Sequence, residues 1–285
     1  MSFMRVVGSR RSIRWFQPRA AVEPAKVQRI LEAARMTGCP GNVQPWRAVV
    51  VVQADLDPVD RERLLDAANR QRAHEQAPVW IYWFCDPAAA APSVFMEQIA
   101  LGLRLGALAE GAGWSEDAAR SAIDDGVPAP PGMPPLHQIV HGVPPEIGAL
   151  VAAREVIGAC TIATLAAVDE GLGTCLHVPA APQSAGTLFE VLRVPAHFTP
   201  IWLQLVGYPA ERPEAGGQRP REPFDQLFAE GQWGVPYSRD PDVVAGLERD
   251  GLIQAQAPLP GREEELVQLT RMFGYSAGSA DNTEA

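Results

Sequence analysis

The sequence predicts an α+β fold, because helical and strand patterns follow one another without regular strand–helix alternation. Apolar residues recur at helical spacing in several segments, the longest of which spans 147–170. Three short apolar runs instead have the length and composition of buried strands. With 285 residues, of which 47% are apolar and 20% charged, the chain is typical of a globular protein with a sizeable core.

The first half of the chain is predicted to mix helices and strands of ordinary length. Apolar residues recur from Val27 to Ala34, after Pro24, which predicts a helix over 24–36. Ser115 is placed to cap a short helix. The other elements expected here are a turn-rich loop over 38–45, a strand over 48–52, a helix over 58–68, a strand over 79–85 and a helix over 93–113.

Prolines and glycines divide the second half. Seven prolines between Gly126 and Pro145 exclude regular structure there, and so long a loop is usually functional or disordered. The helix over 147–170 is rich in alanine and glycine, which lets another helix approach closely, and Gly171 is suited to end it. The remaining expected elements are a third strand over 201–207, a connector over 211–223 and two weak helical patterns over 242–249 and 263–273.

The charge balance excludes a general nucleic-acid binder, because the formal net charge is −10. The beginning of the chain is nevertheless basic: five arginines precede the first acidic residue, Glu23. Positive charge concentrated on an acidic protein indicates a small anionic ligand. Because Lys26 is the single lysine, a phosphate site must be built from arginines and backbone amides.

The cysteines and the apolar segments indicate the cellular compartment in which the protein is expected. The four cysteines form no CxxC pair, so neither a zinc ribbon nor dithiol chemistry is expected, and no metal is predicted. Cys85 and Cys160 lie in apolar surroundings and are expected in the core. No signal-peptide pattern is present, and no segment is expected to span a membrane, which makes the cytoplasm the default location.

Two arginine pairs are the first candidate binding residues. Arg10, Ser12 and Arg14 alternate, so in an extended segment all three side chains point to one face. Arg219 and Arg221 repeat the spacing after the last strand. Arginine makes charge-assisted, often bidentate contacts with phosphate, so the two pairs could converge on one ligand. The alternatives are a solvated basic strand and a surface loop.

Amide side chains are the second group of candidates. Asn42 and Gln44 lie in the loop before the first strand, where amides could contact a ribityl hydroxyl or a heterocycle edge. An Asx-turn is the alternative for Asn42. Gln71 could likewise reach a ring edge, whereas Asn69 is at least as well placed to cap a helix. The sequence contains no GxSxG motif, Walker loop or clear catalytic triad.

Taken in order, five motifs between residues 10 and 223 resemble the FMN-dependent nitroreductase family. They are Arg-x-Ser-x-Arg-x-Phe over 10–16, Asn-x-Gln-Pro-Trp over 42–46, Ala-Pro at 77–78, Gly-Leu-Gly at 171–173, and Gly-Tyr-Pro at 207–209 followed by Arg-x-Arg-x-Pro over 219–223. The chain departs from the family at Cys39, where the loop usually has a serine, and after the Gly-Leu-Gly, where a glycine often found near the ring is missing.

The resemblance implies a mixed central sheet flanked by helices, in a homodimer with FMN at each subunit interface. The resemblance implies that Arg10, Ser12, Arg219 and Arg221 hold the phosphate. Arg14 would lie beside the pyrimidine pole of the ring. Asn42 and a residue near Gln71 would reach its polar edge. The residues expected to bind the cofactor are Arg10, Arg11, Ser12, Arg14, Asn42, Gln44, Gln71, Gly173, Arg219 and Arg221.

The implied activity is hydride transfer from NAD(P)H, through the flavin, to an electron-poor small molecule such as a nitroaromatic or a quinone. The flavin performs the chemistry, so no protein residue is expected to be catalytic. Two alternatives stay open. The same scaffold could support dehalogenation, oxidative dehydrogenation or flavin fragmentation, or the protein could bind flavin without catalysis and act through a partner surface.

The motifs also divide the chain. Residues 1–227 are expected to form the FMN-binding domain, with a family-variable insertion over 86–149, and residues 228–285 a C-terminal extension. The insertion carries Phe95, Met96 and Trp114, which suit stacking over a flat ring. We therefore expect it to cover the pocket on the substrate side.

Overall fold

The computed structural model describes residues 1–108, 115–126, 131–132, 135–142, 144–210 and 218–254. The strands are β1 (Trp46–Val52), β2 (Val79–Cys85), β3 (Gly173–His177) and β4 (Thr199–Gly207). The helices are α1 (Phe3–Ser9), α2 (Pro24–Arg35), α3 (Pro58–Ala67), α4 (Arg72–Gln76), α5 (Pro92–Arg104), α6 (Glu116–Arg120), α7 (Leu136–His141), α8 (Pro145–Asp169), α9 (Ala185–Leu192), α10 (Phe224–Leu227) and α11 (Pro241–Arg249).

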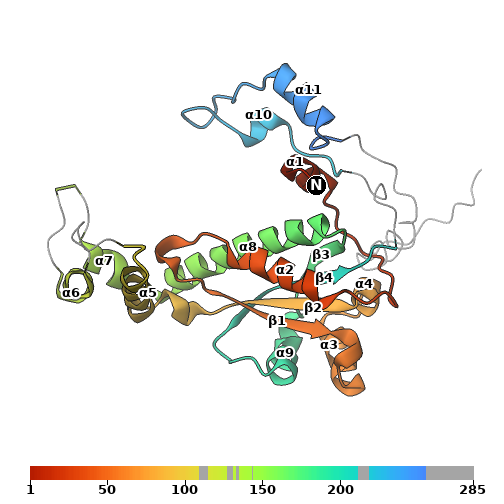
Figure 1. Cartoon of the computed structure of the whole chain (residues 1–285), viewed down its shortest axis with the longest axis horizontal. Helices are drawn as coiled ribbons and strands as arrows, with labels where there is room; N and C mark the ends of the chain where they lie inside the picture. Colours follow the sequence, from red (N-terminus) through yellow and green to blue (C-terminus); the bar gives the residue numbers. More distant parts are fainter. Residues whose placement is uncertain (109–114, 127–130, 133–134, 143, 211–217, 255–285) are drawn as a thin grey trace, which may run out of the picture.

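The four strands form one sheet in the order β1-β2-β4-β3, and each neighbouring pair is antiparallel. The sheet lies between two helical layers, with α2 and α8 on one face and α3 and α9 on the other (Figure 1). The predicted α+β class with a central sheet flanked by helices is thus confirmed, but the described strands form an antiparallel sheet and not the mixed sheet that was expected. A parallel pairing is present only as an isolated bridge between Ser12 and Thr174, among the residues described.

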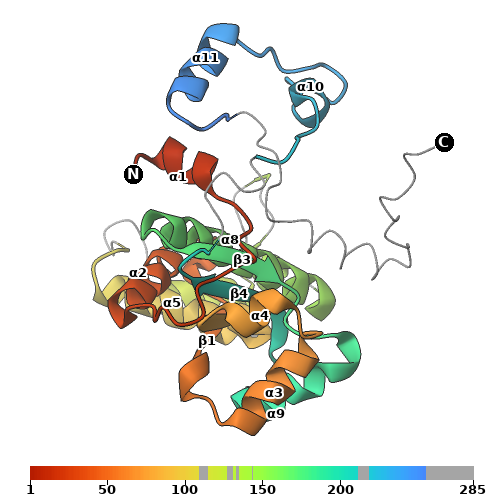
Figure 2. The same cartoon turned by 90° about the vertical axis from the view of Figure 1, so that its right-hand side faces the viewer.

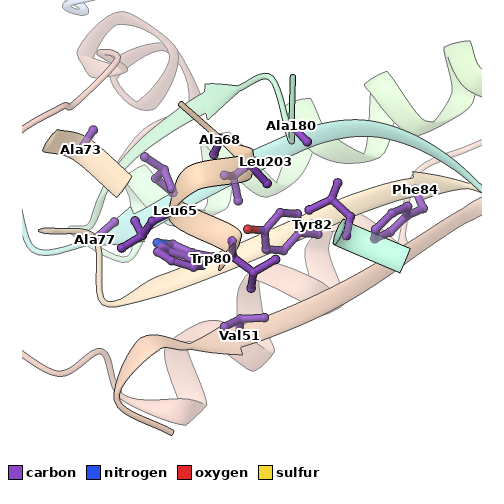
Figure 3. Close-up of a cluster of buried hydrophobic side chains, with 14 of the residues drawn as sticks. Val51, Leu65, Ala68, Ala73, Ala77, Trp80, Tyr82, Phe84, Ala180 and Leu203 are labelled. Atoms are coloured by element: carbon purple, nitrogen blue, oxygen red, sulfur yellow. The ribbon is translucent and has the colours of Figure 1, made fainter. Parts of the chain in front are cut away.

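The central strand β2 shows why the sheet has a core on both faces. All seven of its residues are buried. Trp80, Tyr82 and Phe84 point toward α3 and α9 (Figure 3), whereas Ile81 and Trp83 point toward α2 and α8. This period of two follows from strand geometry, and it explains why the sequence of β2 is apolar throughout rather than alternating.

Helix α8 is the main support of the second face. Its small side chains pack against α2, which confirms the expectation of close helix–helix approach. Gly171 ends it in the left-handed conformation, with φ of 75°, as predicted for a glycine at that place. The buried residues of α8 are Ala152, Val156, Ala159, Cys160, Ala163, Thr164 and Ala167.

The composition of α8 also corrects an expectation. By length and composition alone, Glu146–Asp169 is sufficiently apolar to span a membrane, contrary to the sequence analysis. One face of the helix packs on the sheet and α2, as expected for a core helix of a globular fold. Ile147, Leu150 and Ile157 lie on the opposite face and are between 48% and 58% exposed.

Other differences have local causes. Strand β3 was not predicted, since its five residues include no long apolar run and are a strand because they pair with β4. Helix α7 lies inside the proline-rich stretch that was expected to lack regular structure; Pro135 precedes its first residue, where proline is tolerated. The helix expected over 93–113 ends at Arg104. Trp114 and the pattern over 263–273 lie outside the described residues.

The C-terminal extension stands apart from the sheet and its helices. Helix α11 of this extension, and α10 just before it, lie on the same side of the molecule as α1, well separated from α3 and α9 (Figures 1 and 2). A bridge between Ala229 and Pro236 stabilises the turn between the two helices. After α11 the chain turns at Gly251, which has a φ of 77°, and contacts α1 again.

Candidate functional site

The segment Arg10–Arg14 is fixed in an extended conformation by β3. The Ile13 backbone N–H donates to the Thr174 carbonyl at 3.1 Å, and Ser12 forms the parallel bridge to the same residue. Ile13 is buried in the core, with its side chain against the Cα of Gly173. A Cβ at that glycine would lie 2.8 Å from the Ile13 side chain, so the absence of a side chain lets the arginine segment lie close to the sheet.

The residues that follow β4 form hydrogen bonds with the N-terminal segment just after Arg14. The Gln17 N–H donates to the Tyr208 carbonyl at 2.9 Å, and the Ala210 N–H donates to the Trp15 carbonyl at 2.9 Å. The N-terminal segment is therefore anchored between β3 and the chain that follows β4. Residues 218–221, further along that chain, contribute to the same pocket.

A pocket of about 520 Å³ lies at this junction. The described residues of its lining include five arginines and no carboxylate, although the protein as a whole carries a net charge of −10. Such a concentration of one sign of charge in a concave site favours an anionic ligand. The described residues that line it are Val7, Gly8, Arg10, Arg11, Ser12, Arg14, Gln218, Arg219, Arg221, Leu252 and Ile253.

Three of these arginines are not neutralised. The guanidinium groups of Arg10, Arg219 and Arg221 form no hydrogen bond or ion pair with the residues that the structure describes. Arg14 donates from Nη1 to the Ser12 carbonyl oxygen at 3.3 Å. The two arginine pairs recognised in the sequence thus meet in one pocket with donors available for a ligand.

Arg11 has a different role from its neighbours. Its Nη1 donates to the carbonyl oxygens of Gly8 at 2.6 Å and of Arg10 at 3.0 Å, and its Nη2 donates to Gln254 Oε1 at 2.7 Å. Arg11 lines the pocket, but at least three of its N–H groups form hydrogen bonds within the protein. It therefore fixes the shape of the pocket and adds positive charge to it.

Asn42 and Gln44 lie at the other end of the sheet. Trp46, just after them, pairs with Cys85, whereas Gly173, beside the arginine segment, pairs with Gly207 at the opposite end of the sheet. A strand of this length spans roughly 20 Å. Within one chain, the structure therefore does not bring Asn42 and Gln44 to the arginine pocket.

The loop that carries these amides has a defined local structure. Asn42 and Gln44 both have positive φ, of 54° and 47°. Asn42 Nδ2 donates to Gln98 Oε1 in α5 at 2.9 Å, a contact to another element rather than an Asx-turn. The Cys39 Sγ accepts from the Gln44 backbone N–H at 3.2 Å, so this thiol serves as a structural acceptor in the loop.

Gln71 and Gly173 also lie outside the residues that line the pocket. Gln71 is the residue before α4, and its carbonyl accepts from the His74 N–H at 2.9 Å. Gly173 supports the pocket indirectly, through its contact with Ile13. Of the ten residues predicted to bind a cofactor, six line one pocket and four do not.

Two histidines that were not singled out in the sequence meet near this site: His74 is buried and His177 is half-buried. The rings of His74 in α4 and His177 at the end of β3 meet edge to face, with centroids 4.7 Å apart. Both nitrogens of His74 and the Nε2 of His177 are buried without a hydrogen-bond partner among the described residues. No local motif marks such a pair, since it forms only when α4 packs beside β3.

Both histidines are held neutral. Burial lowers the pKa of His74 to about 4. Burial, then His74 and then the charge of Arg14 lower the pKa of His177 to about 3. Arg14 lines the arginine pocket, whereas neither histidine is among the described residues that line it. A neutral imidazole offers one donor and one acceptor, so the pair adds uncharged polar groups beside the cations.

The described residues contain no cluster of three or more histidine, cysteine or acidic side chains suited to hold a metal ion. Cys85 and Cys160 are buried, as expected, and burial raises the pKa of the Cys85 thiol to about 11. The thiols of these two core residues are consequently protonated at neutral pH and unsuited to nucleophilic chemistry.

A sequence model of the nitroreductase family matches residues 7–124. This region contains the first arginine pair, the amide loop and α4. The resemblance to the nitroreductase family is confirmed. No curated protein matches the sequence.

Solved structures show the same nitroreductase-like fold. A protein from Exiguobacterium sibiricum, assigned as a nitroreductase and crystallised with FMN, is 17% identical, with a TM-score of 0.64 over 81% of this chain and 97% of that chain. A nitroreductase family protein from Streptococcus pneumoniae is 22% identical, with a TM-score of 0.56 over 80% and 100%. A protein from Staphylococcus epidermidis assigned as an NAD(P)H:FMN oxidoreductase is 14% identical, with a TM-score of 0.62 over 81% and 96%.

The arginine pocket also contains residues that sequence reasoning missed. Gln218 immediately precedes the second arginine pair and could have been included with it. Gly8 lies in α1, a helix that was not predicted. Leu252 and Ile253 come from the C-terminal extension, more than 30 residues after Arg221, and no local pattern links them to a phosphate site.

Proposed function

We propose that the protein is an FMN-dependent oxidoreductase that passes a hydride from NAD(P)H, through the bound flavin, to an electron-poor small molecule. The observation that carries the proposal is the pocket whose described lining has five arginines and no carboxylate. The family match and the fold support an oxidoreductase in general. A second arginine-rich site of this kind is not present among the described pockets.

The residues present fit a terminal phosphate. Arg10, Arg219 and Arg221 provide donors that the described protein does not use, and Ser12 lines the same pocket. Charge-assisted hydrogen bonds from arginine to phosphate oxygens are about twice as strong as neutral ones. A monophosphate dianion would also relieve the mutual repulsion of cations gathered in one pocket. These four residues would hold the phosphate of FMN.

The polar end of the flavin ring would lie toward Arg14. A cation there stabilises negative charge that develops on the ring, and the neutral His74–His177 pair keeps the surroundings polar without adding further charge. When bound, the flavin supplies the hydride chemistry. The protein's contribution is to bind, orient and polarise, which agrees with the lack of a recognisable acid–base pair in the sequence.

We further propose that the active form is a homodimer. Ile147, Leu150 and Ile157 are exposed on the face of α8 that points away from the sheet, where a second copy would cover them. A two-fold dimer could also bring the amide loop of one chain near the arginine pocket of the other. The amide loop and the arginine pocket lie at opposite ends of the sheet in one chain. An interface between two copies would bring the loop of one chain to the pocket of the other.

Purified protein tests the proposal directly. It should be yellow, release FMN rather than FAD on denaturation, and oxidise NAD(P)H in the presence of a quinone or a nitroarene. Protein that binds FMN but consumes no NAD(P)H with any acceptor would favour the non-catalytic alternative. Protein that stays colourless and cannot be reconstituted with FMN would overturn the proposed function.

A further inference from the structure

The C-terminal extension contributes to the arginine pocket. Leu252 and Ile253 line it from the turn that follows α11. The turn is well defined, since the Leu252 N–H donates to the Leu247 carbonyl at 2.9 Å and the Gly251 N–H to the Glu248 carbonyl at 3.1 Å. A segment outside the predicted FMN-binding domain thus forms one wall of the candidate phosphate site.

Two side chains connect this turn to both arginine-bearing segments. Gln218 donates from Nε2 to the Gly8 carbonyl at 3.0 Å and to the Leu252 carbonyl at 2.6 Å, and its Oε1 accepts from the Gln254 N–H at 3.0 Å. The Arg11 guanidinium donates to Gln254 Oε1 at 2.7 Å. The turn is therefore bonded to the residue before Arg219 and to the residue after Arg10.

The backbone of α1 fits closely against the same turn. A Cβ at Gly8 would lie 1.9 Å from the Gly251 carbonyl oxygen and 2.7 Å from the Leu252 Cα. Both are backbone atoms, so they could not rotate aside. The glycine lets the extension approach α1 to within contact distance, and any larger residue would push the turn away from the pocket.

We propose that the turn Gly251–Gln254 belongs to the phosphate site and contributes to phosphate binding. Phosphate binding and docking of the C-terminal extension against α1 would then stabilise each other. This inference rests on the proposed function. Docking fixes the backbones next to Arg10 and Arg219 and holds Arg11 in place, which pre-organises the donors. Because such coupling is reciprocal, a bound phosphate must in turn hold the extension against α1.

The affinity arm of the test uses the full-length protein. Gly8→Ala displaces the turn sterically, and Gln254→Ala removes the acceptor of Arg11 while keeping every arginine. Each should weaken FMN binding about tenfold, as expected when donors to a charged group lose their alignment. Riboflavin, which lacks the phosphate, should bind both variants as it binds the unchanged protein. Gly246→Ala in α11, where a Cβ makes only an ordinary contact, is the matched control.

The reciprocal arm measures the extension itself. In hydrogen exchange, FMN or inorganic phosphate should slow the amides of Leu252 and Gln254 in the unchanged protein, and riboflavin should not. If the unchanged protein binds FMN but both variants keep its affinity, or lose FMN and riboflavin affinity equally, the inference is wrong and the proposed function stands. If the unchanged protein binds no FMN, both are overturned.

Discussion

At the scale of single residues, the pocket arginines that have no partner among the described residues are the most informative feature of the chain. Arg221→Ala should lower FMN affinity about ten- to a hundredfold, because it removes a charge-assisted contact worth roughly 1.5 to 3 kcal/mol. Fluorescence titration with FMN measures this, and riboflavin affinity should change little. Arg19→Ala, an exposed arginine outside the pocket, is the control. An unchanged FMN affinity in the Arg221 variant would place the phosphate elsewhere.

The buried histidine His74 predicts a pH dependence of stability. The pKa of His74 is about 4 in the folded protein, against 6.5 for an ordinary histidine, so the unfolded chain binds more protons between these values. The contribution of His74 to the free energy of unfolding is therefore complete above pH 6.5 and is lost as the pH falls toward 4. The loss is about 1.4 kcal/mol per pH unit at most, or roughly 3 kcal/mol in total.

Chemical denaturation at several pH values tests this expectation. His74→Gln cannot take up a proton, so its unfolding free energy should fall less steeply below pH 6.5 than that of the unchanged protein. His197→Gln, at a histidine whose side chain is 58% exposed, is the comparison variant. Equal slopes for all three proteins would mean that the His74 ring is not buried in a neutral state.

At the scale of elements, the sequence predicts best those segments whose pattern is local. Helix α2 and helix α8 lie within two residues of their expected bounds, and β1 and β4 extend their expected runs by two residues. Strand β3 depends on pairing with β4, and α1 begins at the chain's third residue without a hydrophobic period, so neither was expected. The arginine pairs were recognisable because their spacing is local. The place of Leu252 in the pocket could not be recognised in the sequence, because it depends on how the C-terminal extension folds back against α1.

The exposed face of α8 predicts an interface. Leu150→Glu and Ile157→Glu each place a charge where a second copy would bury an apolar side chain, and a buried unpaired charge is costly. Either variant should therefore shift the protein toward monomers, which light scattering at low micromolar concentration would show. Val59→Glu, on the exposed surface of α3 across the sheet, should leave the mass unchanged. A flavin-loaded monomer of the unchanged protein would contradict the dimer.

The insertion has a small core of its own rather than an open aromatic surface. Ile99, Ala119 and Ile123 are buried together, and Phe95 and Met96 pack against them. The Phe95 ring also lies against Gly41, so α5 rests on the loop that carries the amides. This contact places α5 beside the amide loop, and the role of the insertion as a substrate-side wall stays a prediction.

Shortening the insertion tests that role. Replacing residues 127–143 by a brief glycine–serine link removes α7 and its contact through His137 to the Ile123 carbonyl. FMN affinity should be retained, because the arginine pocket lies elsewhere, whereas KM for the electron acceptor should change. If the rate and KM stay the same with every acceptor, the insertion does not form part of the substrate site.

At the scale of the whole molecule, eight of the ten predicted ligand residues fall into two groups. Six line the arginine pocket, while Asn42 and Gln44 lie at the other end of the sheet, roughly 20 Å away. No rearrangement of side chains within one chain could unite them. If both groups serve one flavin, the amide loop must come from the partner subunit, and each site of the dimer then contains residues of both chains.

Mixed dimers test this division. Chains with Arg221→Ala and chains with Asn42→Ala should each form homodimers with impaired FMN binding and low NAD(P)H oxidation. In a heterodimer isolated with two different affinity tags, both changes fall in one site and the second site contains neither. Activity and FMN binding should therefore return at that intact site. If every site belonged to a single chain, both sites of the heterodimer would stay impaired, and its activity would only equal the mean of the two homodimers.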